Sequence, residues 1–156
     1  VGQNLGSGNI DRAKRGIRTA FFMSLLCTAL IILPVMLFAP FWASVFNRDA
    51  AVVAQATQLL RVITPFYLCC SVNQIFAASL RGAGNSRAPM IIMLTCFIGI
   101  RQIYLFTMSH YISNELLHIG LGYPLGWFCC AVTMLLYYLH FDFSKVAVVK
   151  KAQAGA

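Results

Sequence analysis

The sequence predicts an all-α integral membrane protein with four transmembrane helices. Residue types A, V, I, L, M, F, W, Y and C make up 60% of the 156 residues, and only 10% are charged. Soluble proteins contain about 45–50% apolar and about 25% charged residues. The few charges separate four long runs, each close to or above the roughly 20 residues that cross a bilayer. Lipid offers no hydrogen bonds, so the backbone of each run is expected to be helical.

The first two helices are predicted over residues 19–46 and 53–80. The first run is long for a bilayer and carries no charge. It contains Pro34, which we expect to kink the helix, and Pro40, which lies near its outer end. A more polar stretch, residues 50–60, leads into the charge-free part of the second run.

The third and fourth helices are predicted over residues 88–111 and 120–140. The third run is interrupted by a single charge, Arg101, and the fourth has none. Within the fourth run, Gly122 and Gly126 are four residues apart and allow another helix to approach closely. We therefore expect a tight helix contact at this position.

The basic residues predict the orientation in the membrane. Nine lie in segments on one side and at most two on the other, Arg48 and Arg61. By the positive-inside tendency, the loop 1–18 and the tail 141–156 are expected in the cytoplasm, in a multi-pass protein of the cell (inner) membrane. The nine are Arg12, Lys14, Arg15, Arg18, Arg81, Arg87, Lys145, Lys150 and Lys151.

The net charge of +8 is explained by this orientation and by contacts with anionic lipid headgroups. We predict no nucleic-acid partner, because no basic helix or aromatic platform stands outside the membrane to bind one. Val1 is not an initiator methionine, and residues 1–18 do not form a signal peptide. We therefore expect the chain to be a piece of a longer protein.

Two turns on the predicted cytoplasmic side share a pattern. Residues 6–9 (GSGN) precede the first predicted helix, and residues 82–85 (GAGN) precede the third. Glycine ends a helix readily by adopting a positive φ, and a following Asn, Asp or Ser caps the next helix. A phosphate-binding loop is not indicated, since neither Gly-Lys-Ser/Thr nor GxGxxG is present.

The sequence does not indicate an enzyme. It contains no Ser/His/Asp arrangement, no pair of carboxylates on one helix face and no cluster with metal-ligand spacing. We predict no catalytic residue, no metal and no cofactor. The cysteines all lie in apolar runs, where small inert thiols are expected; they are Cys27, Cys69, Cys70, Cys96, Cys129 and Cys130.

Polar residues inside the runs are the candidates for a substrate or ion cavity. The second run carries Tyr67, Asn73 and Gln74, and the third carries Arg101 and Tyr104. Tyr67 and Gln74 lie at i and i+7, on one helix face. Such groups either hold helices together, usually for about 0.6–2 kcal/mol each, or line a polar cavity. Both interpretations remain open for Asn73 and Gln74.

Arg101 is the most unusual of these residues, because it lies in the middle of its run. A central arginine costs at least about 2.5–3.5 kcal/mol on insertion scales, so a compensating partner is required. All four acidic residues of the chain lie near the ends of the runs. The partner is therefore a carboxylate from another part of the protein, water in a central cavity, or backbone carbonyls.

Several strings stand in a fixed order along nearly the whole chain. They are residues 1–9 (VGQNLGSGN), 11–15 (DRAKR), 46–49 (FNRD), 60–67 (LRVITPFY), 73–74 (NQ), 80–85 (LRGAGN), 100–101 (IR) and 124–127 (PLGW). In this order they resemble the multidrug and toxic compound extrusion (MATE) transporters.

The resemblance implies four helices that form part of the second six-helix lobe of a twelve-helix transporter, helices nine to twelve. It implies export of organic, often cationic, compounds in exchange for sodium ions or protons, by alternating access between lobes. The implied partners are the bilayer, small organic substrates, and the N-terminal lobe and remaining helices of the same protein. Two positions depart from the family: Leu59 stands where many members have Tyr, and the second run lacks a carboxylate. A coupling cation would then use acids elsewhere.

Two other functions are consistent with the sequence. Arg101 also suits a lipid-linked oligosaccharide flippase of the same superfamily, which would have a more cationic cavity. A non-transporting membrane subunit, complete as four helices, is the alternative from a different class.

Overall fold

The computed structural model describes residues 1–112 and 115–144, and every regular element in these two ranges is helical. Within these ranges, four helical stretches are long and apolar enough to cross a membrane, which confirms the predicted all-α fold with four membrane spans. In chain order the spans are Ile10–Leu37, Ala50–Gly82, Arg87–Ile112 and Leu116–His140. Most of the predicted tail, with its three lysines, lies outside the described residues.

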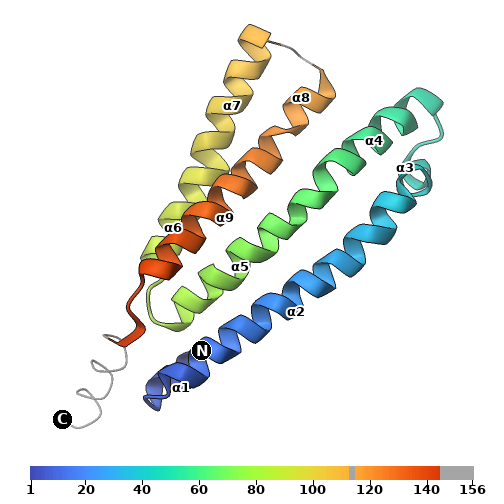
Figure 1. Ribbon diagram of the computed structural model, residues 1–156. Coiled ribbons are helices and arrows are strands. Elements are labelled where there is room, and N and C mark those ends of the chain that lie inside the picture. Colours follow the sequence, from blue (N-terminus) through green and yellow to red (C-terminus); the bar gives the residue numbers. More distant parts are fainter. Residues whose placement is uncertain (113–114, 145–156) are drawn as a thin grey trace.

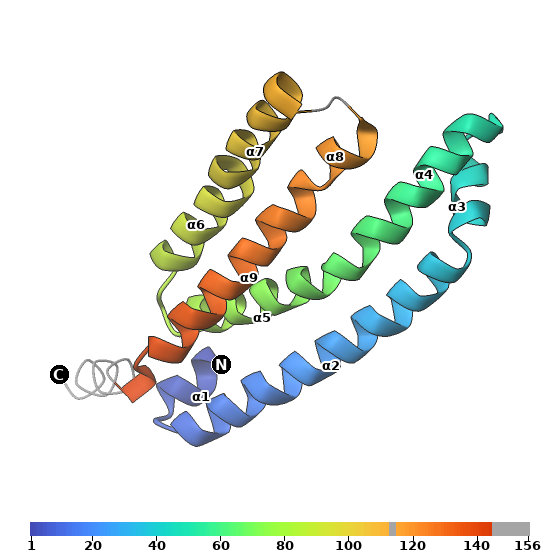
Figure 2. The same ribbon diagram turned by 45° about the horizontal axis from the view of Figure 1, so that its top comes forward.

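The spans lie side by side in the order first, second, fourth, third (Figure 1, Figure 2). Helix α2 (Ile10–Leu37) packs along the second span, which is formed by α4 (Ala50–Ile63) and α5 (Tyr67–Gly82). The fourth span consists of α8 (Leu116–Gly120) and α9 (Gly122–His140). Helix α9 contacts both α5 and the third span. Helices α5 and α9 are therefore the two inner helices of the described part of the chain.

The N-terminal segment differs from the loop predicted over residues 1–18. Helix α1 (Gly2–Gly6) is followed by a turn in which Gly8 has a φ of +79°, and α2 already begins at Ile10. The first two turns of α2 bury Ala13 and Ile17 against the rest of the protein. This burial explains why the basic segment is helical. The glycine pattern predicted the turn correctly, and Gly84 repeats it with a φ of +88°.

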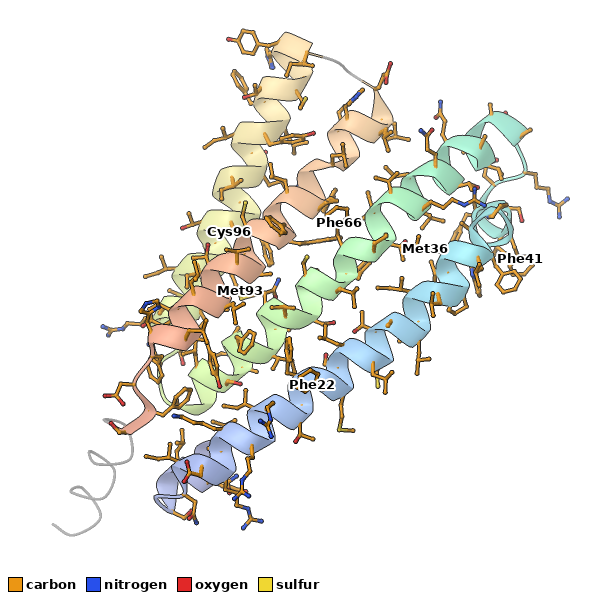
Figure 3. The ribbon with its side chains drawn as sticks, viewed as in Figure 1. Phe22, Met36, Phe41, Phe66, Met93 and Cys96 are labelled. Atoms are coloured by element: carbon orange, nitrogen blue, oxygen red, sulfur yellow. The ribbon has the colours of Figure 1, made fainter. Side chains whose placement is uncertain are left out.

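The predicted first helix, 19–46, is divided in the structure. Helix α2 continues through Pro34 and ends at Leu37, and α3 (Ala39–Phe46) follows after a break at Phe38. Pro40 explains the break, because it has no amide hydrogen to donate to the carbonyl of residue 36. Pro40 instead occupies the first turn of α3, where no such bond is needed. Met36 and Phe41, labelled in Figure 3, lie on either side of this break.

The second span begins earlier than residue 53 because its N-terminus is capped. The Asp49 carboxylate accepts hydrogen bonds from the amides of Ala51 (2.8 Å) and Val52 (3.3 Å), so α4 begins at Ala50. At Pro65 the span tightens into one 3₁₀ turn, η1 (Thr64–Phe66), before α5 begins. The span is thus one long helix with a local irregularity at its proline.

The third span alternates between two helix types. Helices α6 (Arg87–Leu94) and α7 (Arg101–Thr107) are α-helical, and η2 (Thr95–Ile100) and η3 (Met108–Ile112) are π-helical. A π-helical turn carries i→i+5 hydrogen bonds and is often found at functional sites. Here η2 ends directly before Arg101. No feature of the sequence predicted this irregularity.

Two glycines bring α9 into close contact with the third span, as predicted. A Cβ added at Gly126 would lie 3.2 Å from the backbone oxygen of Cys96, and one at Gly122 would lie 3.0 Å from the ring of Tyr104. Figure 3 labels Cys96, which lies where the third span meets α9. A side chain at either position would push the two spans apart.

The buried core is concentrated where α1, α2, α5 and α9 meet. Leu5, Leu80 and Met134 are completely buried. The ring of Phe76 on α5 lies between those of Phe21 on α2 (5.3 Å between ring centres) and Tyr138 on α9 (4.5 Å). This aromatic stack joins three spans, and it fixes α5 between α2 and α9.

We predict that Gly126→Ala lowers the melting temperature of the purified protein in detergent. The added methyl meets a backbone oxygen that cannot rotate away, and such overpacking typically costs about 1–3 kcal/mol. Gly16→Ala is the matched control: its Cβ meets nothing within 4 Å, and alanine is the better helix former. Equal melting temperatures for the two variants would contradict the close contact between α9 and η2.

Candidate functional site

Four side chains from three spans form a continuous series, which we call the aromatic ladder: Tyr67, Trp127, Tyr123 and Arg101. The ring centres of Tyr67 on α5 and Trp127 on α9 are 4.9 Å apart, and those of Trp127 and Tyr123 are 6.0 Å apart. The guanidinium carbon of Arg101 lies 3.7 Å from the centre of the Tyr123 ring. Two predicted candidates, Tyr67 and Arg101, are thus linked through two aromatic residues of α9.

The backbone of α9 explains this arrangement. Tyr123 and Trp127 are separated by four residues and therefore lie on the same face of the helix. The contact of Gly126 with the Cys96 carbonyl draws α9 against η2, and Arg101 follows η2 immediately. Tyr123 and Trp127 are not among the site residues predicted from the sequence. Their i, i+4 spacing was the available signal, but aromatic pairs also occur at lipid-facing and interfacial positions.

The Arg101 guanidinium is only partly satisfied within the described residues. It stacks on Tyr123, while its Nε atom is buried and has no hydrogen-bond partner there. A cation–π contact contributes about 0.5–2 kcal/mol, less than the roughly 2.5–3.5 kcal/mol that a central arginine costs. An aromatic ring was not among the compensating partners expected for Arg101 from the sequence. The cation–π contact offsets part of the insertion cost, and the guanidinium can still donate a hydrogen bond to an acceptor.

Tyr104 packs on Gly122, the residue next to Tyr123, and connects two spans. Its hydroxyl donates a hydrogen bond of 2.8 Å to the backbone carbonyl of His118, and its ring packs on Gly122. This hydrogen bond joins α7 to α8, so the hydroxyl already has a partner within the protein. In the structure, Tyr104 therefore holds two helices together.

The polar residues of α5 face different surroundings. Asn73 is 1% exposed, and neither its amide nitrogen nor its amide oxygen has a hydrogen-bond partner among the described residues. Gln74, the next residue, is exposed. The hydroxyl of Ser71 lies 2.6 Å from that of Thr28 on α2, so this part of α5 faces the first span. The structure thus places Asn73 in the core and leaves Gln74 on the surface.

A polar pocket of about 560 Å³ lies between α4 and α8, at the end of the protein predicted to face outward. Its volume falls within the roughly 300–1,000 Å³ of small-molecule sites. At its rim, the Glu115 carboxylate lies 3.2 Å from Nδ1 of His118. None of the site residues predicted from the sequence lines this pocket. Its lining residues are Gln55, Gln58, Leu59, Glu115, Leu116 and Leu117.

Metal ligands do not cluster in the described part of the chain. Within residues 1–112 and 115–144, no group of three or more His, Cys, Asp or Glu side chains could hold an ion. The six cysteines are free thiols, and Cys96 and Cys130 are buried. The candidate functional features of the described residues are therefore the stacked aromatic rings, one arginine and a polar pocket.

Comparison with known proteins decides the family. The family profile described as MatE matches residues 1–107, which is more than half of the chain. The chain belongs to the MatE family. The matched range contains the five predicted site residues, whereas Tyr123 and Trp127 of the aromatic ladder lie beyond it. The MATE resemblance found in the sequence is confirmed.

Curated relatives of this MatE chain carry names that refer to drug resistance. The chain is 28% identical to the probable multidrug resistance protein YoeA of Bacillus subtilis, over 90% of the chain and 30% of that relative. It is 26% identical to the multidrug resistance protein MdtK of Yersinia pseudotuberculosis, over 87% of the chain and 31% of the relative. It is also 26% identical to the probable multidrug resistance protein NorM of Pasteurella multocida, over 87% and 29%. The chain thus spans about 30% of the length of these relatives. No solved structure matches it.

We predict that Asn73→Leu raises the melting temperature of this MatE protein. An unsatisfied buried amide costs about 1–3 kcal/mol, and leucine has nearly the same shape without that cost. Gln74→Leu, a change of the neighbouring exposed amide, should shift the melting temperature less. A lower melting temperature for Asn73→Leu would show that the Asn73 amide has a stabilising partner in the full protein.

Proposed function

We propose that this chain is part of a secondary active multidrug efflux transporter of the cell (inner) membrane. The observation that carries the proposal is the MatE match over residues 1–107 in a chain with four membrane-length helices. The names of its relatives, all of which refer to multidrug resistance, support drugs as the substrates. The substrates are organic, often cationic, compounds that are exchanged for sodium ions or protons.

In this proposal the aromatic ladder is part of the wall of the substrate cavity. Tyr67 and Tyr123 are 48% and 43% exposed, so their ring faces are available to stack on a flat organic compound. Arg101 covers one face of Tyr123 and fixes its position. The aromatic rings bind the apolar body of many compounds without selecting one shape.

Coupling and alternating access require groups outside the four spans. A site between two lobes opens to either side as one lobe moves against the other. The N-terminal lobe and remaining helices are the proposed partners, and small organic substrates are the cargo. The described part of the second span contains no carboxylate. The coupling sodium ion or proton is therefore assigned to acids elsewhere in the transporter.

The names of the relatives favour drug export over the two alternatives. A flippase for lipid-linked oligosaccharides is not what the names of these relatives refer to. A non-transporting four-helix subunit does not account for the similarity to multidrug resistance proteins over 87–90% of the chain.

The proposed orientation, with both ends of the four-span unit in the cytoplasm, predicts the reactivity of single cysteines. In a variant without native cysteines, Ala50→Cys should react with an impermeant thiol reagent added outside intact cells, and Ser7→Cys should not. Both positions are exposed, so access from one side of the membrane decides the result. If Ser7→Cys reacted from outside and Ala50→Cys did not, the orientation in the membrane would be the opposite of the one proposed.

The efflux function itself is tested with the full-length natural protein in cells that lack other drug pumps. We expect it to export a cationic dye, and we expect Arg101→Leu and Tyr123→Leu each to reduce the export rate roughly tenfold, or about 1.4 kcal/mol of transition-state free energy. Tyr123→Phe keeps the ring under Arg101 and should retain most export. Arg101→Lys should restore export only in part, because an ammonium lacks the planar fork of the guanidinium.

Gln102→Leu is the control for this export test, because it changes an exposed polar residue beside Arg101. Membrane expression and melting temperature are measured for every variant. Normal expression without dye export by the wild type would overturn the efflux function. Unchanged export in Arg101→Leu, at normal expression, would remove the aromatic ladder from the transport site.

A further inference from the structure

An elongated groove of about 480 Å³ runs along the third span from the turn that connects α5 and α6. Its polar end is formed by Arg81, in the last turn of α5, and by Ser86, directly before α6. The rest of the groove is apolar. Its apolar lining residues are Met90, Met93, Leu94, Phe97 and Ile98, and Figure 3 labels Met93.

The apolar part of the groove follows the axis of the span. Met90, Leu94 and Ile98 are spaced by four residues and are 55%, 50% and 55% exposed. They lie on one helix face and extend over about 12 Å at 1.5 Å per residue. The axis of a membrane-spanning helix is close to parallel with the acyl chains of the surrounding lipids. The groove therefore has the orientation that an acyl chain requires.

The polar end of the groove has unused hydrogen-bond donors. Arg81 is exposed and forms no ion pair with any residue that the structure describes. The Ser86 side chain does not cap α6, because the Asn85 carboxamide oxygen accepts the hydrogen bond from the Ala88 amide (3.3 Å) instead. The Asn85 amide nitrogen in turn donates to the Tyr137 hydroxyl on α9 (2.8 Å). Asn85 thus holds the turn in place, and the Ser86 hydroxyl has no hydrogen-bond partner among residues 1–112 and 115–144.

We propose that this groove binds an anionic phospholipid. The Arg81 guanidinium binds the headgroup phosphate, the Ser86 hydroxyl donates a second hydrogen bond, and one acyl chain lies on Met90, Leu94 and Ile98. Arginine is well suited to phosphate, because its charged donors are arranged in a planar fork. Basic pockets between membrane helices on the cytoplasmic side favour anionic lipids for the same reason.

The charge of the groove favours a lipid over a protein helix as its occupant. A helix that covered the apolar part would also need to place an acidic residue at Arg81. A phospholipid carries its phosphate at the membrane interface, at one end of an apolar chain. This is the order of groups found along the groove, where a basic end is followed by an apolar face. The inference requires that the chain lies in a bilayer and rests on the cytoplasmic position proposed above for this turn, and it is independent of drug export.

The full-length natural protein is first delipidated and then mixed with phosphatidylglycerol or phosphatidylcholine. Native mass spectrometry then measures how much of each lipid the protein binds. We expect phosphatidylglycerol to bind more tightly, and Arg81→Gln to weaken its binding about fivefold, the factor that corresponds to roughly 1 kcal/mol for one basic residue. Arg81→Lys should retain part of the preference. Leu94→Trp, which fills the groove without adding a charge, should weaken binding of both lipids.

Arg15→Gln is the matched control, because it removes an exposed basic residue that does not line the groove. An equal loss in Arg15→Gln and Arg81→Gln would overturn the proposal in favour of general surface attraction. A photoactivatable phosphatidylglycerol should cross-link to residues 90–98, whether or not a variant melts at a lower temperature. Cross-links confined to other spans would overturn the proposal. That result would be expected if another part of the transporter covered the groove.

Discussion

The fourth span, formed by α8 and α9, fits between the second and third spans because its backbone lies close to both. At Gly120 an added Cβ would collide with the Leu59 side chain of α4, and at Gly126 it would press on the Cys96 carbonyl of η2. In lipid, helices gain little from hydrophobic burial, so close packing has to supply much of the association energy. The same contacts place Trp127 beside Tyr67 and Tyr123 under Arg101. The aromatic ladder therefore depends on glycines that do not belong to it.

Charge-free runs predicted the four spans correctly, because transfer free energy depends on composition over about 20 residues. Breaks within a span depend instead on individual hydrogen bonds. Pro34 stays inside α2, whereas Pro40 ends up in the first turn of α3. The π-helical turn before Arg101 has no sequence signal either, since it arises where α9 contacts η2.

The candidate site could be predicted only in part from polarity. Polarity selected Tyr67 and Arg101, but the residues that link them, Trp127 beside Tyr67 and Tyr123 beside Arg101, come from a span that contains no charge. Asn73 and Gln74 are adjacent amides, yet one is buried in the core and the other is exposed. A step of one residue along a helix rotates the side chain by about 100°. The choice between a helix contact and a cavity therefore depends on how α5 is rotated against its neighbours.

The free-energy cost of placing Arg101 in the membrane bears on its role in the proposed transport site. Stacking on Tyr123 contributes about 0.5–2 kcal/mol, which leaves part of the insertion cost of about 2.5–3.5 kcal/mol without compensation. The tyrosine ring occupies the face of the guanidinium, whereas hydrogen-bond acceptors approach its edge. An acceptor can therefore bind Arg101 without displacing Tyr123. Within the described residues no hydrogen bond or ion pair occupies that edge. An acceptor from the remaining helices, or from water in the cavity, would complete the compensation while the aromatic ladder stays intact.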